Sequence, residues 1–143
     1  MTRSQHPPFA LEGIDHILLL VSGMRKALEF YCEVLGCSVE NELPEFGMVQ
    51  LRAGRALIDL VDIDAIRGRW ARPGVAGGRN LDHVCIEITE CDEQTLRSHL
   101  AAHDVAIIEE GFHEGARGNS LSIYVRDPSG NTIEMKGPPP SSQ

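Results

Sequence analysis

Residues 15–21, DHILLLV, have a near-repeat later in the chain at residues 82–88, DHVCIEI. Both stretches open with an Asp-His pair and continue as apolar runs short enough to be strands, in which alternate side chains share one face. In the second run His83 shares its face with Cys85 and Glu87, and the opposite face is aliphatic. The repeat predicts two related halves, each opening with a strand that carries a histidine.

The segments that follow each histidine predict the same order of elements: one helix and then three strands. In the first half, apolar residues recur at helical spacing from Met24 to Leu35, Ser22 stands at the N-cap position and Gly36 at the stop. The strands predicted for this half are residues 14–21, 37–41, 47–52 and 55–62. For the second half we predict strands at residues 82–88, 105–109, 120–126 and 131–136, and a helix near residues 92–103.

Length and composition predict one compact domain. A chain of 143 residues with 42% hydrophobic residues buries roughly 70% of its extended surface, which is enough for one core but not for two. We expect a single domain at residues 13–137, with modules at about 13–64 and 81–137 joined by a Gly- and Arg-rich loop, 65–80, that lies over the site or links the halves. Residues 1–12 and 138–143 contain prolines and are expected to be tails.

The charge and the apolar pattern restrict the partners. A formal net charge of −8 disfavours nucleic acid and anionic membranes, which bind clustered Lys and Arg. No secretory signal is visible and no apolar run could span a bilayer, so we expect a cytoplasmic protein that binds a small molecule. The four cysteines lack CxxC spacing, and we interpret them as reduced, partly buried thiols.

Carboxylates recur on the polar side of two later strands. Asp59 alternates with Ile58 and Leu60, and Glu134 alternates with Ile133 and Met135. If helices cover the aliphatic face, the other face of the sheet curls around a cavity that collects polar groups. The residues expected there are His16, Asp59, His83, Glu87, Tyr124 and Glu134.

Imidazole and carboxylate groups in one cavity are typical of a divalent metal site. They suit Fe(II), Ni(II), Zn(II), Mn(II) or Co(II), and the sequence does not choose among these ions. A lone strand histidine is usually an ordinary core or surface residue, but the duplicated pair with Glu134 favours one metal ion per site. The alternative pair, His99 and His103, lies in the last turn of the predicted helix, where the helix dipole favours histidines. We therefore interpret this pair as helix surface residues and not as the main metal site. We interpret His113 as an exposed loop residue that could otherwise face substrate.

Four segments of the chain resemble one superfamily. They are GIDHILLLV at residues 13–21, ALEFYCEVLGCSV at 27–39, LDHVCIEI at 81–88 and SIYVRDPSGNTIEMK at 122–136. Together they resemble the vicinal oxygen chelate superfamily, which contains glyoxalases, bleomycin-resistance proteins and extradiol dioxygenases. The resemblance implies an α+β fold in which two tandem βαβββ modules form a curled mixed sheet around a cavity, with helices on the outer face.

The resemblance also implies roles for individual residues. His16, His83 and Glu134 match the commonest metal-ligand positions, and Asp59 falls where glyoxalases place a fourth ligand, normally Glu. Tyr124 matches a tyrosine that hydrogen-bonds substrate in extradiol dioxygenases, although Tyr124 and Glu87 could equally be polar rim residues. Glu134, or a second carboxylate such as Glu87, would move a proton in a glyoxalase-like reaction.

Two functions from different classes therefore stay open. The first is a divalent-metal-dependent enzyme, a lyase, isomerase or ring-cleaving dioxygenase, whose substrate chelates the metal through vicinal oxygens. The second is a metal-free protein of the bleomycin-resistance type that sequesters a small molecule. The resemblance implies a homodimer in either case, with sites formed within one chain or across two.

Overall fold

The computed structural model describes residues 10, 12–71 and 81–140 of the chain. Within these residues the strands form two four-stranded mixed sheets, in the orders β1-β4-β3-β2 and β5-β8-β7-β6. In each sheet the strand that comes first along the chain pairs in parallel with the strand that comes last, β1 with β4 and β5 with β8. The other pairs are antiparallel. The strands are β1 (His16–Val21), β2 (Ser38–Leu43), β3 (Met48–Ala53), β4 (Ala56–Asp62), β5 (Val84–Glu87), β6 (Glu109–His113), β7 (Ser120–Arg126) and β8 (Thr132–Lys136).

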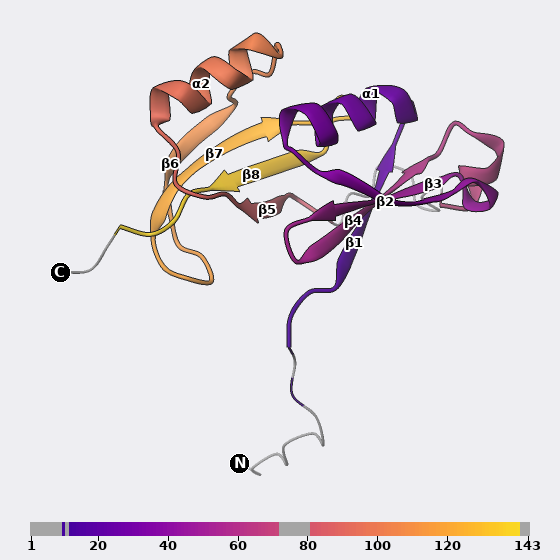
Figure 1. Ribbon diagram of the computed structural model, residues 1–143, viewed down its shortest axis with the longest axis horizontal. Coiled ribbons are helices and arrows are strands. Elements are labelled where there is room, and N and C mark those ends of the chain that lie inside the picture. The colour runs from indigo at the N-terminus through magenta and orange to yellow at the C-terminus, as the bar shows by residue number, and fades with distance from the viewer. Residues whose placement is uncertain (1–9, 11, 72–80, 141–143) are drawn as a thin grey trace.

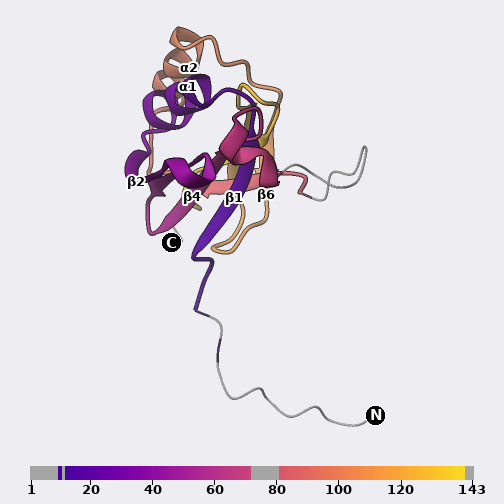
Figure 2. The ribbon, with the colours of Figure 1, turned by 90° about the vertical axis from the view of Figure 1, so that its right-hand side faces the viewer.

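The longer helices lie on one side of the two sheets, as Figures 1 and 2 show. They are α1 (Met24–Leu28), which continues as the π-helix η1 (Glu29–Val34), and α2 (Glu93–Ala102). Two short 3-10 segments, η2 (Pro44–Phe46) and η3 (Ile66–Ala71), belong to the first half. The predicted pair of βαβββ modules with curled mixed sheets and helices outside is therefore confirmed.

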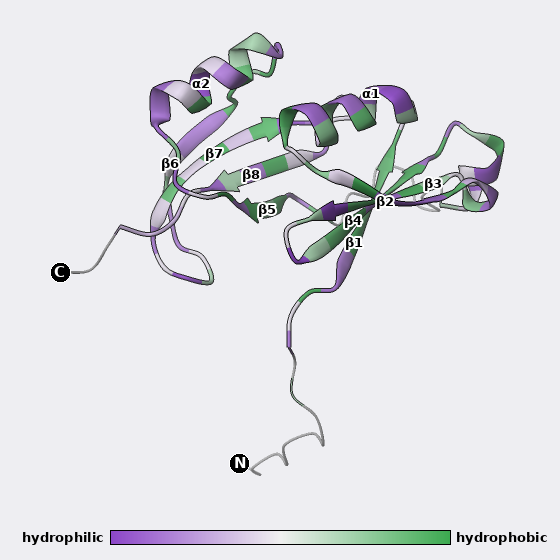
Figure 3. Ribbon diagram, in the orientation of Figure 1, coloured by the Kyte–Doolittle hydropathy of each residue, from purple (hydrophilic) through white to green (hydrophobic). Residues whose placement is uncertain are grey.

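One core serves both halves. Leu19 and Leu60 of the first sheet and Ile123 and Ile133 of the second are at most 2% exposed and belong to the same apolar cluster. Alternate positions along the strands supply these side chains, and hydrophobic segments accordingly mark β1, β4 and β8 in Figure 3. Burying each such side chain contributes about 1.5 to 3 kcal/mol, so the shared core joins the modules.

The turn between β7 and β8 also joins the halves. The Tyr31 hydroxyl of η1 donates to Asp127 Oδ2 over 2.7 Å, and both side chains are buried. Asn131 Nδ2 donates to the Leu20 carbonyl at 3.1 Å, and the backbone N–H of Ser22 donates to Ser129 Oγ at 2.8 Å. The turn at residues 127–130 is therefore a contact between modules as well as a reversal of the chain.

The start of the first helix differs from the prediction. Gly23 is the N-cap residue, and no side chain of the helix segment caps it. Instead Asp62, at the end of β4, accepts the backbone N–H groups of Gly23 and Met24 at 3.2 and 3.1 Å. The prediction that Ser22 caps the helix was wrong, because a carboxylate distant in sequence satisfies the same donors. Gly36 ends the helix at a φ of 87°, as predicted.

The second helix begins with a local cap. Asp92 accepts the Thr95 backbone N–H at 3.0 Å. We expect Asp92→Ala to lower the free energy of unfolding by about 1 kcal/mol, because a first-turn N–H loses its partner. Urea unfolding measures the change. Asp92→Asn, which keeps an acceptor, is the matched control, and equal losses in both variants would contradict the capping role.

Three further boundaries bear on the site. β6 occupies residues 109–113, so the strand predicted at 105–109 was placed too early, and His113 ends a strand instead of lying in a loop. Residues 66–71 of the predicted loop 65–80 form η3, whereas 72–80 lie outside the described residues, as do most of the two predicted tails. The domain limits stay a prediction.

No described helix combines the length and apolarity needed to cross a bilayer.

Candidate metal centre

Each sheet holds one histidine against one buried carboxylate. His16 Nε2 lies 3.8 Å from Asp59 Oδ2 in the first sheet, and His83 Nε2 lies 3.1 Å from Glu134 Oε1 in the second. The carboxylates are only 3% and 5% exposed. All four residues are metal-ligand candidates by sequence, and the fold arranges them as two pairs.

The two pairs occupy equivalent positions in the sheets. In the parallel pairing of β1 with β4, Asp59 stands opposite Leu18, two residues after His16. In the parallel pairing of β5 with β8, Glu134 stands opposite Cys85, two residues after the second histidine. The same register in both modules shows that the repeat in sequence is also a repeat of site geometry.

The aspartate before each histidine orients the imidazole ring. His16 Nδ1 lies 2.7 Å from Asp15 Oδ1, and His83 Nδ1 lies 2.7 Å from Asp82 Oδ2. A hydrogen bond at Nδ1 leaves Nε2 facing the carboxylate of β4 or β8, which is how ligand histidines are commonly held. The hydrogen bond to Asp15, with the nearby Asp59 charge, raises the pKa of His16 above its ordinary value.

Glu134 is surrounded by hydrogen-bond donors. Ser122 Oγ donates to Glu134 Oε2 at 2.6 Å, and the Tyr124 hydroxyl also donates to this carboxylate. Burial alone would raise the pKa of Glu134, but these two donors, together with the charges of His83 and Lys136, hold it below its ordinary value. Burial, followed by the bond to Glu134, raises the pKa of Tyr124 to about 12. The site therefore keeps an ionised carboxylate beside a neutral phenol.

Asp59 has fewer partners than Glu134. Gln50, its antiparallel neighbour on β3, donates to Asp59 Oδ2 at 3.3 Å. Gln50 is thus the counterpart of Tyr124, which stands opposite Glu134 on β7. Asp59 Oδ1 is buried and has no hydrogen-bond partner among the described residues. A buried carboxylate oxygen without a donor suits a cation or a ligand hydroxyl.

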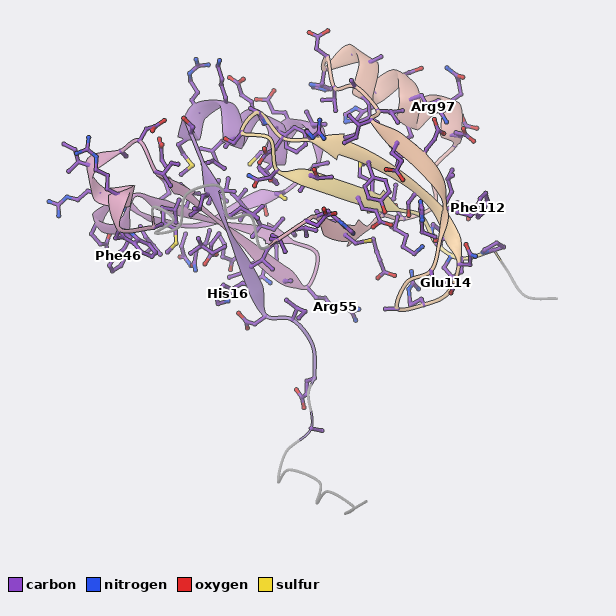
Figure 4. All side chains as sticks on the ribbon, turned by 180° about the vertical axis from the view of Figure 1, so that it is seen from behind. His16, Phe46, Arg55, Arg97, Phe112 and Glu114 are labelled. Atoms are coloured by element: carbon purple, nitrogen blue, oxygen red, sulfur yellow. The ribbon has the colours of Figure 1, made fainter. Side chains whose placement is uncertain are left out.

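The donor types fit a divalent metal, but the pairs are held apart. Among residues 10, 12–71 and 81–140, no group of three or more His, Cys, Asp or Glu side chains is close enough to hold an ion. Figure 4 places His16 at the end of β1 away from the helices. A full ligand set would need the two pairs to approach, so the metal assignments stay predictions.

The other candidate residues have different surroundings. Glu87 is exposed and accepts from Arg117 Nε at 2.6 Å, so its predicted part in proton transfer would need that ion pair to open. The His113 ring lies 5.6 Å from that of Tyr124, and its buried Nε2 has no partner in the described part of the chain. His99 bonds the Val34 carbonyl from α2, which agrees with a structural role.

Four contributors to the site were not assigned a role from the sequence. The aspartates had a visible signal in the sequence, because one precedes each repeated histidine. The glutamine and the serine become recognisable only through strand register and side-chain contacts, which place them beside the carboxylates. The four residues are Asp15, Asp82, Gln50 and Ser122.

Comparison with known proteins identifies the family. The profile of the Glyoxalase/Bleomycin resistance protein/Dioxygenase superfamily matches residues 13–135. The chain belongs to this superfamily. Its match spans both modules and includes both His–carboxylate pairs, so the resemblance noted in the sequence is confirmed at the level of the family.

Three similar proteins illustrate the range of similarity to this chain. Virulence protein STM3117 of Salmonella typhimurium has a crystal structure that superposes with a TM-score of 0.69 at 26% identity, covering 92% of this chain and all of that chain. Glyoxalase domain-containing protein RDO1 of Mycosarcoma maydis is 31% identical over 92% of this chain and 71% of its own. The mitochondrial methylmalonyl-CoA epimerase of Bos taurus is 27% identical over 91% and 77%.

Proposed function

We propose that this superfamily member is a divalent-metal-dependent lyase or isomerase that moves a proton next to a carbonyl of a small substrate. The substrate would bind the metal through two adjacent oxygens. The observation that supports this proposal is the pair of equivalent His–carboxylate arrangements, because Asp59 stands beside His16 as Glu134 stands beside His83. One relative is named methylmalonyl-CoA epimerase, and its name indicates an isomerase, which is the reaction class proposed here.

The four side chains of the two pairs would hold the metal, which we propose to be shared between modules of one chain or of a homodimer. Bound there, the ion would supply Lewis-acid stabilisation of negative charge on a substrate oxygen. His16 and His83 present Nε2 because Asp15 and Asp82 engage Nδ1.

Glu134 is the better placed of the two candidate proton carriers. It is held ionised and oriented by Ser122 and Tyr124, whereas Glu87 is paired with Arg117. An ionised, oriented carboxylate can accept a proton from carbon without first losing its own. Tyr124 stays neutral because of its raised pKa, so its hydroxyl donates to Glu134 while its oxygen can accept a hydrogen bond from a substrate hydroxyl.

Metal reconstitution with an assay of proton transfer tests the proposal. Protein purified without chelators is loaded anaerobically with Fe(II), Ni(II), Zn(II), Mn(II) or Co(II), and bound metal is measured by elemental analysis. Loaded protein is then assayed in D₂O with a glutathione hemithioacetal and in aerobic buffer with a catechol panel. Deuterium appearing at the carbon beside the product carbonyl is the expected result.

Two other outcomes would contradict the proposal. Oxygen consumption with a catechol would instead show the ring-cleaving dioxygenase activity. Failure of the protein to bind any of these ions after reconstitution would favour the metal-free binding protein of the bleomycin-resistance type.

Loss of the donors to Glu134 should impair the reaction. We expect Ser122→Ala and Tyr124→Phe each to lower activity or metal affinity about 10- to 100-fold, because each removes a hydrogen bond that orients the carboxylate. Steady-state kinetics and metal competition measure the two effects. Ser120→Ala is the matched control, since Ser120 Oγ donates to the Gly137 carbonyl instead. Activity unchanged in both site variants would contradict this role.

A further inference from the structure

A cleft lies between the two modules on the side of the molecule that carries the helices (Figure 1). One wall is the first helix, from Lys26 to Val34, and the other is formed by residues 103–108 together with Arg126 and Pro128. The volume of the cleft is about 520 Å³, a size typical of small-molecule sites. We call it the junction cleft, because both modules line it and none of the four metal-ligand candidates does.

The floor of the junction cleft is apolar. Phe30 of η1 is 4% exposed and belongs to the core, and Val34 and Val105 pack against the core from the two walls. The wall that carries Phe30 is a π-helix, a geometry that is rare in proteins and frequent at functional sites. A ligand in the cleft would therefore remove apolar surface of both modules from water.

Four charged side chains border this floor. Lys26 and Glu33 lie on the first helix, and Asp104 and Arg126 lie on the opposite wall. Within the described part of the chain none of these four side chains forms an ion pair or a hydrogen bond. The cleft therefore holds opposite charges apart instead of neutralising them.

The charges are arranged along the length of the cleft. Lys26 and Glu33 are seven residues apart in the sequence, which places them roughly 10 Å apart along the helix axis. Asp104 lies toward the Glu33 end, because it follows α2, whose His99 bonds the carbonyl of Val34. The junction cleft thus has a cationic end at Lys26 and an anionic end at Glu33 and Asp104.

We infer that the junction cleft binds a small zwitterion whose carboxylate and ammonium are separated by an apolar chain. The carboxylate binds Lys26, the ammonium binds Glu33 and Asp104, and the apolar chain lies on Phe30. A ligand with a single charge would leave the opposite end of the cleft without a counter-ion. This binding site is separate from the proposed catalytic function, and it needs no metal.

Calorimetry on the metal-free, full-length chain tests the inference with probes of equal chain length. 8-Aminooctanoic acid carries both charges, octanoic acid lacks the ammonium, and octylamine lacks the carboxylate. We expect 8-aminooctanoic acid to bind about tenfold more tightly than either analogue, because each lost charge removes a charge-assisted hydrogen bond. Equal affinities for the probes, or no binding of 8-aminooctanoic acid, would overturn the inference.

Single substitutions test the two ends of the cleft separately. Lys26→Met should weaken the binding of octanoic acid and leave that of octylamine unchanged, whereas Glu33→Gln should do the reverse. Arg25→Met and Glu114→Gln are the matched controls, because Arg25 pairs with Glu29 and neither control residue lines the cleft. All four substituted side chains are exposed, so the variants should fold. Losses of affinity that do not follow the charge of the probe would contradict the assigned ends.

Amide chemical shifts locate the bound probe. Binding in the junction cleft should shift the signals of Val34 and Ala106, which line it from the two walls, and leave that of His83 unchanged. Shifts confined to His83 and its neighbours would place the probe on the sheet face and overturn the inference. If no probe binds and Lys26→Met converts a dimer to a monomer in sedimentation, the cleft is a subunit contact and the inference is wrong. The proposed function stands in each case, because its test depends on bound metal.

Discussion

The His83→Ala variant is expected to lose stoichiometric metal and measurable turnover. His83 lies 3.1 Å from Glu134 and is oriented by Asp82, so it is the best-defined ligand candidate in the chain. Removing groups that merely orient a ligand already costs about 10- to 100-fold in affinity, and loss of the ligand itself should exceed 100-fold. Elemental analysis and competition with a chromogenic chelator measure the change.

His103→Ala is the matched control for this variant. His103 follows α2, and its ring makes an edge contact with the His99 ring at a centroid distance of 4.8 Å, on the helix side of the sheets. This control should keep metal and activity. Full metal content in His83→Ala would show that His83 is not a ligand, and the proposed site would then be wrong. Circular dichroism of both variants verifies the fold.

The second large effect is expected at the contact between the modules. Asp127→Ala should lower the free energy of unfolding by about 3 kcal/mol or more, because the buried carboxylate accepts the Tyr31 hydroxyl and the backbone N–H groups of Ser129 and Asn131. Each buried donor left unsatisfied costs about 1 to 3 kcal/mol. Urea unfolding measures the loss.

A graded series separates the bond between modules from the turn. Tyr31→Phe deletes one hydroxyl and should cost about 1 to 2 kcal/mol. Asp127→Asn keeps an acceptor for the turn and should fall between Asp127→Ala and wild type. A loss below about 1 kcal/mol in Asp127→Ala would mean that the apolar core alone holds the modules together.

Local signals in the sequence predicted most elements of the fold. Helix α2 lies within the predicted residues 92–103, β7 matches the predicted range of residues 120–126, and Gly36 ends the first helix. These features depend on neighbours within a few residues, so periodicity and cap chemistry suffice to recognise them. The strand predicted at residues 105–109 was misplaced because it was inferred from local alternation alone. The apolar residues Val105 and Ile107 pack on the core but do not join the sheet.

Local sequence signals could not predict contacts between residues that are distant in the chain. The first helix is capped by Asp62 from another strand, and Gln50 supports Asp59 only because β3 pairs with β4 in one register. A one-residue shift of that register would turn Gln50 to the opposite face. The sequence contains these residues but not the pairing that makes them partners.

The sequence by itself determined the repeated Asp-His strands, the order of elements, the family and the identity of the four ligand candidates, since each depends on residue type and short-range spacing. Tertiary structure decided that the candidates form two separate pairs, that Glu87 is held by Arg117, and that Gln50 bonds Asp59 whereas Ser122 bonds Glu134. The physical reason is that strand pairing brings together side chains distant in the chain, and register fixes which face each one shares.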